Sequence, residues 1–146
     1  MSQIYQHPSG GRLFQVGVSE IQPLVETRPI HLIIFNAAGI QPKGVFPSIA
    51  KVYVPFEDTT RLDVFEIADV LDKVERASDV ACQYLSQGKN VISSCAAGLN
   101  RSGLTSALTL HKCSPLSKLE IVNRIRKYRH PSALSNILFL QMFLTS

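Results

Sequence analysis

The sequence contains no tryptophan and only three cysteines, Cys82, Cys95 and Cys113. Their odd number and their spacing match neither a disulfide framework nor a zinc-binding pattern. No apolar run approaches the roughly 20 residues that span a bilayer, and no charged segment followed by an apolar stretch stands at the beginning. We therefore expect a cytoplasmic protein without a signal peptide or membrane contact, in a reducing compartment that keeps thiols available for chemistry.

The composition is that of an ordinary globular chain. Apolar residues make up 45% and charged residues 18% of the 146 residues, which excludes a disordered chain and fits one domain over residues 1–146. The formal net charge is +4. This charge favours anionic partners such as phosphate esters, nucleic acid or acidic lipid, but it does not choose among them.

Strand and helix patterns alternate along the chain. Short apolar or alternating runs predict strands at residues 13–18, 31–36, 51–56 and 90–93. Apolar residues at spacings of three and four predict helices at residues 64–85, 102–113, 117–128 and 135–144. The alternation predicts an α/β fold with a central mixed, partly parallel sheet covered by helices.

Local signals mark some of the element ends. Ser117 and Glu120 form the pattern of a capping box, and either Ser135 or Asn136 can cap the last helix. The stretch Pro42-Lys43-Gly44 predicts a turn between two strands.

The segment that joins the strand at 90–93 to the helix at 102–113 carries the clearest chemical signal. Cys95 and Arg101 form a Cys-x5-Arg pattern followed by Ser102, and the residues between them are Ala96, Ala97, Gly98, Leu99 and Asn100. Small residues before a helix let successive N–H groups turn inward, and the helix N-terminus adds a positive field. A cysteine in this field is stabilised as the nucleophilic thiolate.

The arginine completes a predicted phosphate site. Its planar and permanently charged guanidinium can bind two phosphoryl oxygens at once. Read as a bare pattern, the same residues could instead be a buried cysteine at a strand end and an unrelated surface arginine. A Walker-type nucleotide site does not fit, because Gly-x4-Gly-Lys-[Ser/Thr] is absent.

This segment resembles the signature loop of the dual-specificity branch of the protein tyrosine phosphatases, His-Cys-x-x-Gly-x-x-Arg-Ser. Four residues fall on its defining positions: Cys95, Gly98, Arg101 and Ser102. The resemblance covers most of the chain, including Val54 to Asp58 and the stretch from Arg129 to Phe139. It implies the compact tyrosine phosphatase-like fold and the hydrolysis of phosphate monoesters through a phosphocysteine intermediate, without a metal or another cofactor.

The resemblance also implies roles for residues outside the loop centre. Ser102 would assist the thiolate as it leaves the phosphocysteine. Asp58 would be the general acid because of its local context, whereas Asp63 lies at the more usual spacing from Cys95 in a weaker context. Arg129 would bind substrate in a secondary anion pocket. One departure stands out: Ser94 occupies the position of the family's histidine.

The predicted substrates are phosphotyrosine and phosphoserine or phosphothreonine of proteins. The loop residues between Cys95 and Arg101 include no lysine, which disfavours a phosphoinositide. An adaptor that binds phosphate without turnover, an RNA 5′-phosphatase and a persulfide-carrying sulfurtransferase are the alternatives. We expect a monomer whose partner is a phosphorylated protein; nucleic acid is left open as a partner but is not favoured.

Overall fold

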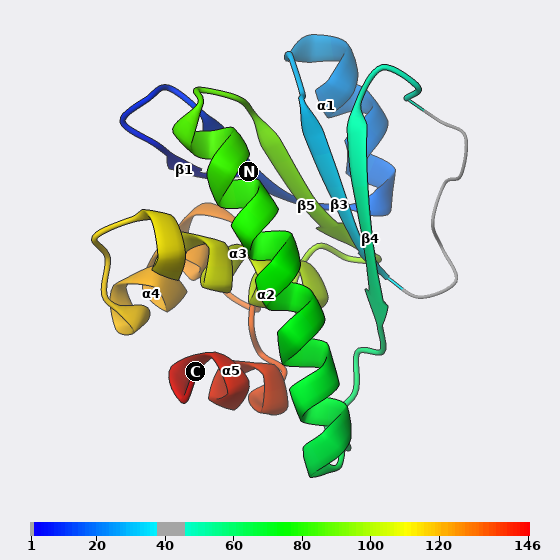
Figure 1. Ribbon diagram of the computed structural model, residues 1–146, viewed down its shortest axis with the longest axis vertical. Coiled ribbons are helices and arrows are strands. Elements are labelled where there is room, and N and C mark those ends of the chain that lie inside the picture. Colours follow the sequence, from blue (N-terminus) through cyan, green and yellow to red (C-terminus); the bar gives the residue numbers. More distant parts are fainter. Residues whose placement is uncertain (1, 38–45) are drawn as a thin grey trace.

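The computed structural model describes residues 2–37 and 46–146. Its strands form one five-stranded sheet in the order β1-β2-β5-β3-β4 (Figure 1). Their bounds are β1 Gln3–Gln6, β2 Arg12–Gly17, β3 Leu32–Ala37, β4 Ala50–Phe56 and β5 Val91–Cys95. Strand β1 pairs antiparallel with β2, and all other neighbours are parallel, so the predicted mixed, partly parallel sheet is confirmed.

The helices agree with the sequence pattern except at the beginning of the chain. They are α1 Ile21–Thr27, preceded by the 3-10 turn η1 Val18–Glu20, then α2 Val64–Ser86, α3 Arg101–Cys113, α4 Lys118–Tyr128 and α5 Ile137–Leu144. Helix α1 and strand β1 were not predicted. Each is short and buries a single residue, Ile21 or Ile4, so neither produces a periodic signal.

Capping explains where several helices begin. The Ser117 hydroxyl accepts from the Glu120 N–H and starts α4, which confirms the predicted capping box. For α5 the structure selects Asn136 as the N-cap. The turn predicted at Pro42-Lys43-Gly44 lies outside the described residues.

The two faces of the sheet carry separate apolar cores, because successive side chains of a strand point to opposite faces. Helices α2 to α5 pack on one face against Leu13, Ile34 and Val91. Helix α1 packs on the other face against Phe14, Phe35 and Ile92. Within the described ranges, no helix has both the length and the apolar character needed to cross a membrane.

The parallel strands bring their carboxyl ends to one edge of the sheet. Gly17 at the end of β2 pairs with Cys95 at the end of β5, and Ala37 of β3 pairs with Phe56 of β4. The segments that follow β2, β4 and β5 therefore begin at the same edge. Ligands of open α/β sheets bind at such an edge.

Candidate active site

The predicted strand–loop–helix segment is present at this edge. Strand β5 ends at Cys95, residues 96–100 form the loop, and α3 begins at Arg101. Cys95 is only 3% exposed. Its Sγ lies 3.2 Å from the Oγ of Ser102, which is fully buried in the first turn of α3. The Ser102 hydroxyl is therefore placed to donate a hydrogen bond to a Cys95 thiolate.

The backbone carbonyls from Ala96 to Leu99 all accept hydrogen bonds from groups outside the loop. The Ala96 carbonyl accepts from Val18 N (3.3 Å), and the Ala97 carbonyl accepts from Arg129 Nη2 (3.0 Å). The Gly98 carbonyl accepts from Arg129 Nε and from Gln15 Nε2, both over 3.0 Å. The Leu99 carbonyl accepts from Leu134 N (3.2 Å) and from Gln15 Nε2 (3.3 Å). A trans peptide unit is planar, so its N–H points opposite to its C=O. The N–H groups of residues 97–100 therefore point the other way, toward the interior of the loop.

These inward N–H groups are arranged in a way that suits an anion. No group within residues 2–37 and 46–146 accepts a hydrogen bond from the backbone N–H of residues 96–100. The first N–H groups of α3 add to them, since the first turn of a helix has no internal acceptors. Successive free N–H groups at the positive end of a helix favour a phosphate or a similar oxyanion.

Arg101 lies between this loop and the end of β4. Its Nη1 donates to the Phe56 carbonyl over 3.3 Å, which fixes the direction of the side chain. Its Nε is buried and donates to no other group in the described part of the chain. A guanidinium has five N–H donors, so this side chain keeps donors for an oxyanion after it has bound Phe56.

The two candidate acids have different surroundings. Asp58 follows β4 and is exposed, and its carboxylate accepts from Asn136 Nδ2 (2.8 Å) and from Asn100 Nδ2 (3.3 Å) of the loop. Asp63 is the N-cap of α2, where it accepts from the Glu66 N–H over 2.8 Å. The geometry therefore places Asp58 beside the loop and gives Asp63 a structural contact.

Ser94, at the position of the family's histidine, makes no hydrogen bond to the Cys95 thiol among the contacts of the described residues. Its side chain is fully buried, and its hydroxyl donates to the Ile34 carbonyl of β3 over 2.8 Å. The hydroxyl thus strengthens the contact between two strands. It is engaged away from the Cys95 thiol.

Buried polar side chains of β3, β5 and α3 form hydrogen bonds beside the loop. Asn36 of β3 donates to the Ser94 carbonyl over 3.0 Å and accepts from the Thr105 hydroxyl of α3 over 2.6 Å. The Ser93 hydroxyl donates to the Ser102 carbonyl over 3.0 Å. These bonds join β3, β5 and α3. No sequence motif pointed to Asn36 or Thr105.

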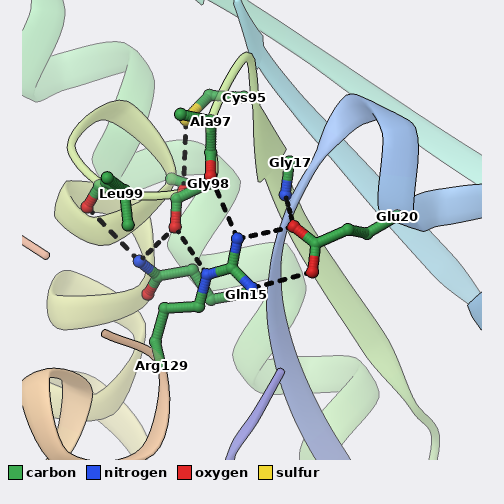
Figure 2. Close-up of polar contacts among 9 residues, drawn as sticks. Gln15, Gly17, Glu20, Cys95, Ala97, Gly98, Leu99 and Arg129 are labelled. Carbon is green, nitrogen blue, oxygen red and sulfur yellow. Dashed lines mark hydrogen bonds and ion pairs between the residues drawn. The ribbon is translucent and has the colours of Figure 1, made fainter. Parts of the chain in front are cut away.

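Arg129 has a different environment from the predicted secondary anion pocket. Its side chain is only 9% exposed and pairs with Glu20 through Nη1–Oε2 (2.9 Å) and Nη2–Oε1 (2.6 Å). The same guanidinium donates to the carbonyls of Ala97 and Gly98 (Figure 2). Arg129 lies against the outside of the loop, where a carboxylate and two carbonyls contact its fork. Its role in binding substrate stays a prediction.

Glu20 is fixed on both sides. Its Oε1 also accepts from the Gly17 N–H over 2.9 Å at the end of β2. The hydrogen bond from Arg129 holds the pKa of Glu20 below its ordinary value. Neither Glu20 nor Gln15 was singled out from the sequence, since a lone acidic or amide residue near a strand end carries no motif.

Comparison with known proteins places this geometry in context. No family model matches the chain, and no curated protein matches it in sequence. Among solved structures, human DUSP28 is similar with a TM-score of 0.72 and 21% identity, over 99% of this chain and 94% of that one. DUSP15 is similar with a TM-score of 0.73 and 17% identity, over 95% and 83% of the two chains.

A third similar structure is the human tyrosine phosphatase-like serine/threonine/tyrosine-interacting protein. It has a TM-score of 0.71 and 14% identity, over 99% of this chain and 93% of that one. The chain therefore has the fold of the dual-specificity branch of the protein tyrosine phosphatases, as the loop motif predicted.

Proposed function

We propose that this chain hydrolyses phosphate monoesters through a phosphocysteine intermediate at Cys95. The observation that carries the proposal is the ring of inward N–H groups at residues 97–100, which surrounds a buried cysteine and ends at Arg101. Such a ring stabilises the negative charge of a transferring phosphoryl group in a fixed geometry. No cofactor enters the proposed reaction.

The proposed reaction has two steps. In the first, the Cys95 thiolate attacks phosphorus, an S–P bond forms, and the bond to the leaving oxygen breaks as Asp58 protonates that oxygen. In the second, water attacks the phosphocysteine while the Asp58 carboxylate takes its proton. Inorganic phosphate and the thiolate are the products. The Ser102 hydroxyl, 3.2 Å from Sγ, stabilises the thiolate as it leaves.

The rim of the site supports a protein substrate. Ala96 and Ala97 are exposed and small, so they leave space for a phosphorylated side chain to approach. We propose phosphotyrosine and phosphoserine or phosphothreonine of a protein as the substrates, with this chain acting as a monomer in the cytoplasm. An RNA 5′-phosphate is the alternative substrate for the same chemistry.

One observation favours a second function, phosphate binding without turnover. The Ser94 hydroxyl is engaged with Ile34, so this position gives no support to the Cys95 thiolate. The anion site formed by the N–H groups would remain intact in such an adaptor. Turnover therefore separates the two functions, whereas phosphate binding does not.

The test is the hydrolysis of an aryl phosphate by the purified chain and by two cysteine variants. We expect turnover by the wild type, none by Cys95→Ser, and unchanged turnover by the matched control Cys113→Ser. Cys113 lies at the far end of α3, outside the loop. If wild type and Cys95→Ser are equally inactive while both bind phosphate, the adaptor function replaces the proposed one.

A further inference from the structure

Arg129 reaches the loop from a distant part of the chain. It is the C-cap residue of α4, and its contacts with Ala97 and Gly98 span more than thirty positions of sequence. Figure 2 shows its guanidinium lying between Glu20 on one side and the loop carbonyls on the other. The contacts combine two ion-pair bonds with two bonds to backbone carbonyls.

We propose that Arg129 and Glu20 form a brace that positions the loop for oxyanion binding, which makes Arg129 a positioning residue. The inference rests on the proposed function of the loop as a phosphate site. The brace acts on the orientation of two peptide units and does not touch the phosphate itself.

The peptide geometry gives the brace its effect. Holding the Ala97 carbonyl outward turns the Gly98 N–H inward, and holding the Gly98 carbonyl outward turns the Leu99 N–H inward. Without the guanidinium, the Ala97 carbonyl loses the donor that fixes it, and its peptide unit can rotate. A carbonyl that rotates into the loop would repel a bound oxyanion.

Glu20 keeps the guanidinium in place. The two form a bidentate pair, and the Glu20 carboxylate is bound in turn to the Gly17 N–H of β2. Gly17 pairs with Cys95 in the sheet, so the brace is anchored beside the nucleophile. The carboxylate also balances the positive charge of Arg129, which leaves Arg101 as the arginine directed at the phosphate.

Close packing at Gly98 shows that the brace and the loop are fitted to each other. Gly98 has a φ of +73°, a conformation that glycine adopts without strain. A Cβ at this position would lie 2.6 Å from Arg129 Nη2. The guanidinium can reach both carbonyls because this residue has no side chain.

The experiment measures the affinity for inorganic phosphate and for tungstate by calorimetry, alongside the melting temperature and the kcat and KM for an aryl phosphate. The variants are Arg129→Gln, Glu20→Gln, the double variant and Arg129→Lys. Arg124→Gln is the matched control, since Arg124 lies on the same helix and contacts Tyr5, Tyr128 and the Ile4 carbonyl instead of the loop.

We expect Arg129→Gln to weaken oxyanion binding by about tenfold to a hundredfold, as the loss of a hydrogen-bond partner that supports a metal ligand weakens metal binding. Glu20→Gln, whose side chain is 43% exposed, should fold and weaken binding by a smaller factor in the same direction. The double variant should bind no worse than Arg129→Gln, because the two residues act as one unit. Arg129→Lys should not restore affinity, since an ammonium lacks the fork.

A melting temperature that falls in Arg129→Gln and Glu20→Gln while oxyanion affinity stays at the wild-type value would overturn the brace. Full affinity in Arg129→Lys would also overturn it, because charge alone would then suffice. A third outcome separates the brace from the proposed function. If the wild type binds phosphate more tightly than Arg129→Gln does but hydrolyses no ester, the proposed function is refuted and the brace stands.

Discussion

The two sides of the loop are held by different kinds of contact. On one side, a nearly buried guanidinium and the buried amide of Gln15 fix the carbonyls of residues 97–99. On the other side, exposed Asp58 is held by the side-chain amides of Asn100 and Asn136. In the proposed reaction, the first side keeps its shape throughout, whereas the second releases and regains a proton and admits the substrate.

This difference connects structure to the proposed chemistry. Buried, bidentate and charge-assisted bonds are stronger and more specific in geometry than exposed neutral ones. A residue that transfers protons belongs where water and substrate can reach it. We therefore expect changes on the braced side to affect oxyanion binding and changes on the Asp58 side to affect protonation of the leaving group.

The largest effect is expected from Gly98→Ala, which breaks the braced side. The added Cβ would clash with the backbone of Val16 and Gly17 and crowd Arg129. We expect loss of measurable tungstate binding and turnover, together with a lower melting temperature. Gly10→Ala is the matched control, since Gly10 also has a positive φ, of +100°, but a Cβ there meets nothing within 4 Å.

The control should lose only about 1–2 kcal/mol of stability from backbone strain, with tungstate binding intact. Calorimetry and thermal melting of both variants make the comparison. Tungstate binding by Gly98→Ala at wild-type strength would show that the loop tolerates a different path from the one described.

The next effect concerns the exposed side and separates Asp58 from Asp63. Asp58→Asn should slow phenyl phosphate hydrolysis by about 10²–10⁴, the usual contribution of a general acid, and slow a nitrophenyl ester far less. Asp63→Ala should instead lose about 1 kcal/mol of stability, because it removes the N-cap of α2. Steady-state kinetics on the two esters, with melting curves, measure both.

Two outcomes would contradict the assignment of Asp58 as the general acid. A leaving-group-dependent loss in Asp63→Ala alone would transfer the acid role to Asp63. Equal losses on both esters in Asp58→Asn would mean that Asp58 positions the loop through Asn100 without donating a proton.

The smallest effect is a pH dependence of stability that originates at Glu20. Its pKa in the folded protein is lowered from 4.5, chiefly by the hydrogen bond from Arg129. A lowered pKa contributes stability that is present above the unfolded value and is lost as the pH falls through the folded value. The stability difference between wild type and Glu20→Gln should therefore shrink below pH 4.5. Urea unfolding across the acid range measures it, and a constant difference would contradict the ion pair.

The sequence predicted the loop and its main catalytic candidates because they are neighbours in the chain. Cys95, Arg101 and Ser102 lie within one strand–loop–helix unit, and the strand and helix around them have clear periodic patterns. The fold class followed from the same alternation. The sequence context favours Asp58 and leaves Asp63 as the alternative acid, and the structure adds the N-cap contact that Asp63 makes with Glu66.

The supporting residues could not be predicted in the same way. The Glu20–Arg129 pair joins positions 109 residues apart, and the Thr105–Asn36 bond joins positions 69 apart. Each of these residues is common on protein surfaces, and nothing in one sequence says which distant partner it meets. The role of Ser94 was equally hidden, since its acceptor is the carbonyl of a neighbouring strand.

The phosphocysteine itself is the most direct test of the central claim. The wild-type chain and Cys95→Ser would be mixed rapidly with an aryl phosphate, quenched in acid, digested and examined by mass spectrometry. We predict one added phosphoryl group on the peptide that contains Cys95, appearing within the first turnover and absent from Cys95→Ser. Steady turnover with no phosphoryl group on Cys95 at any quench time, or with the group on another residue, would contradict the account.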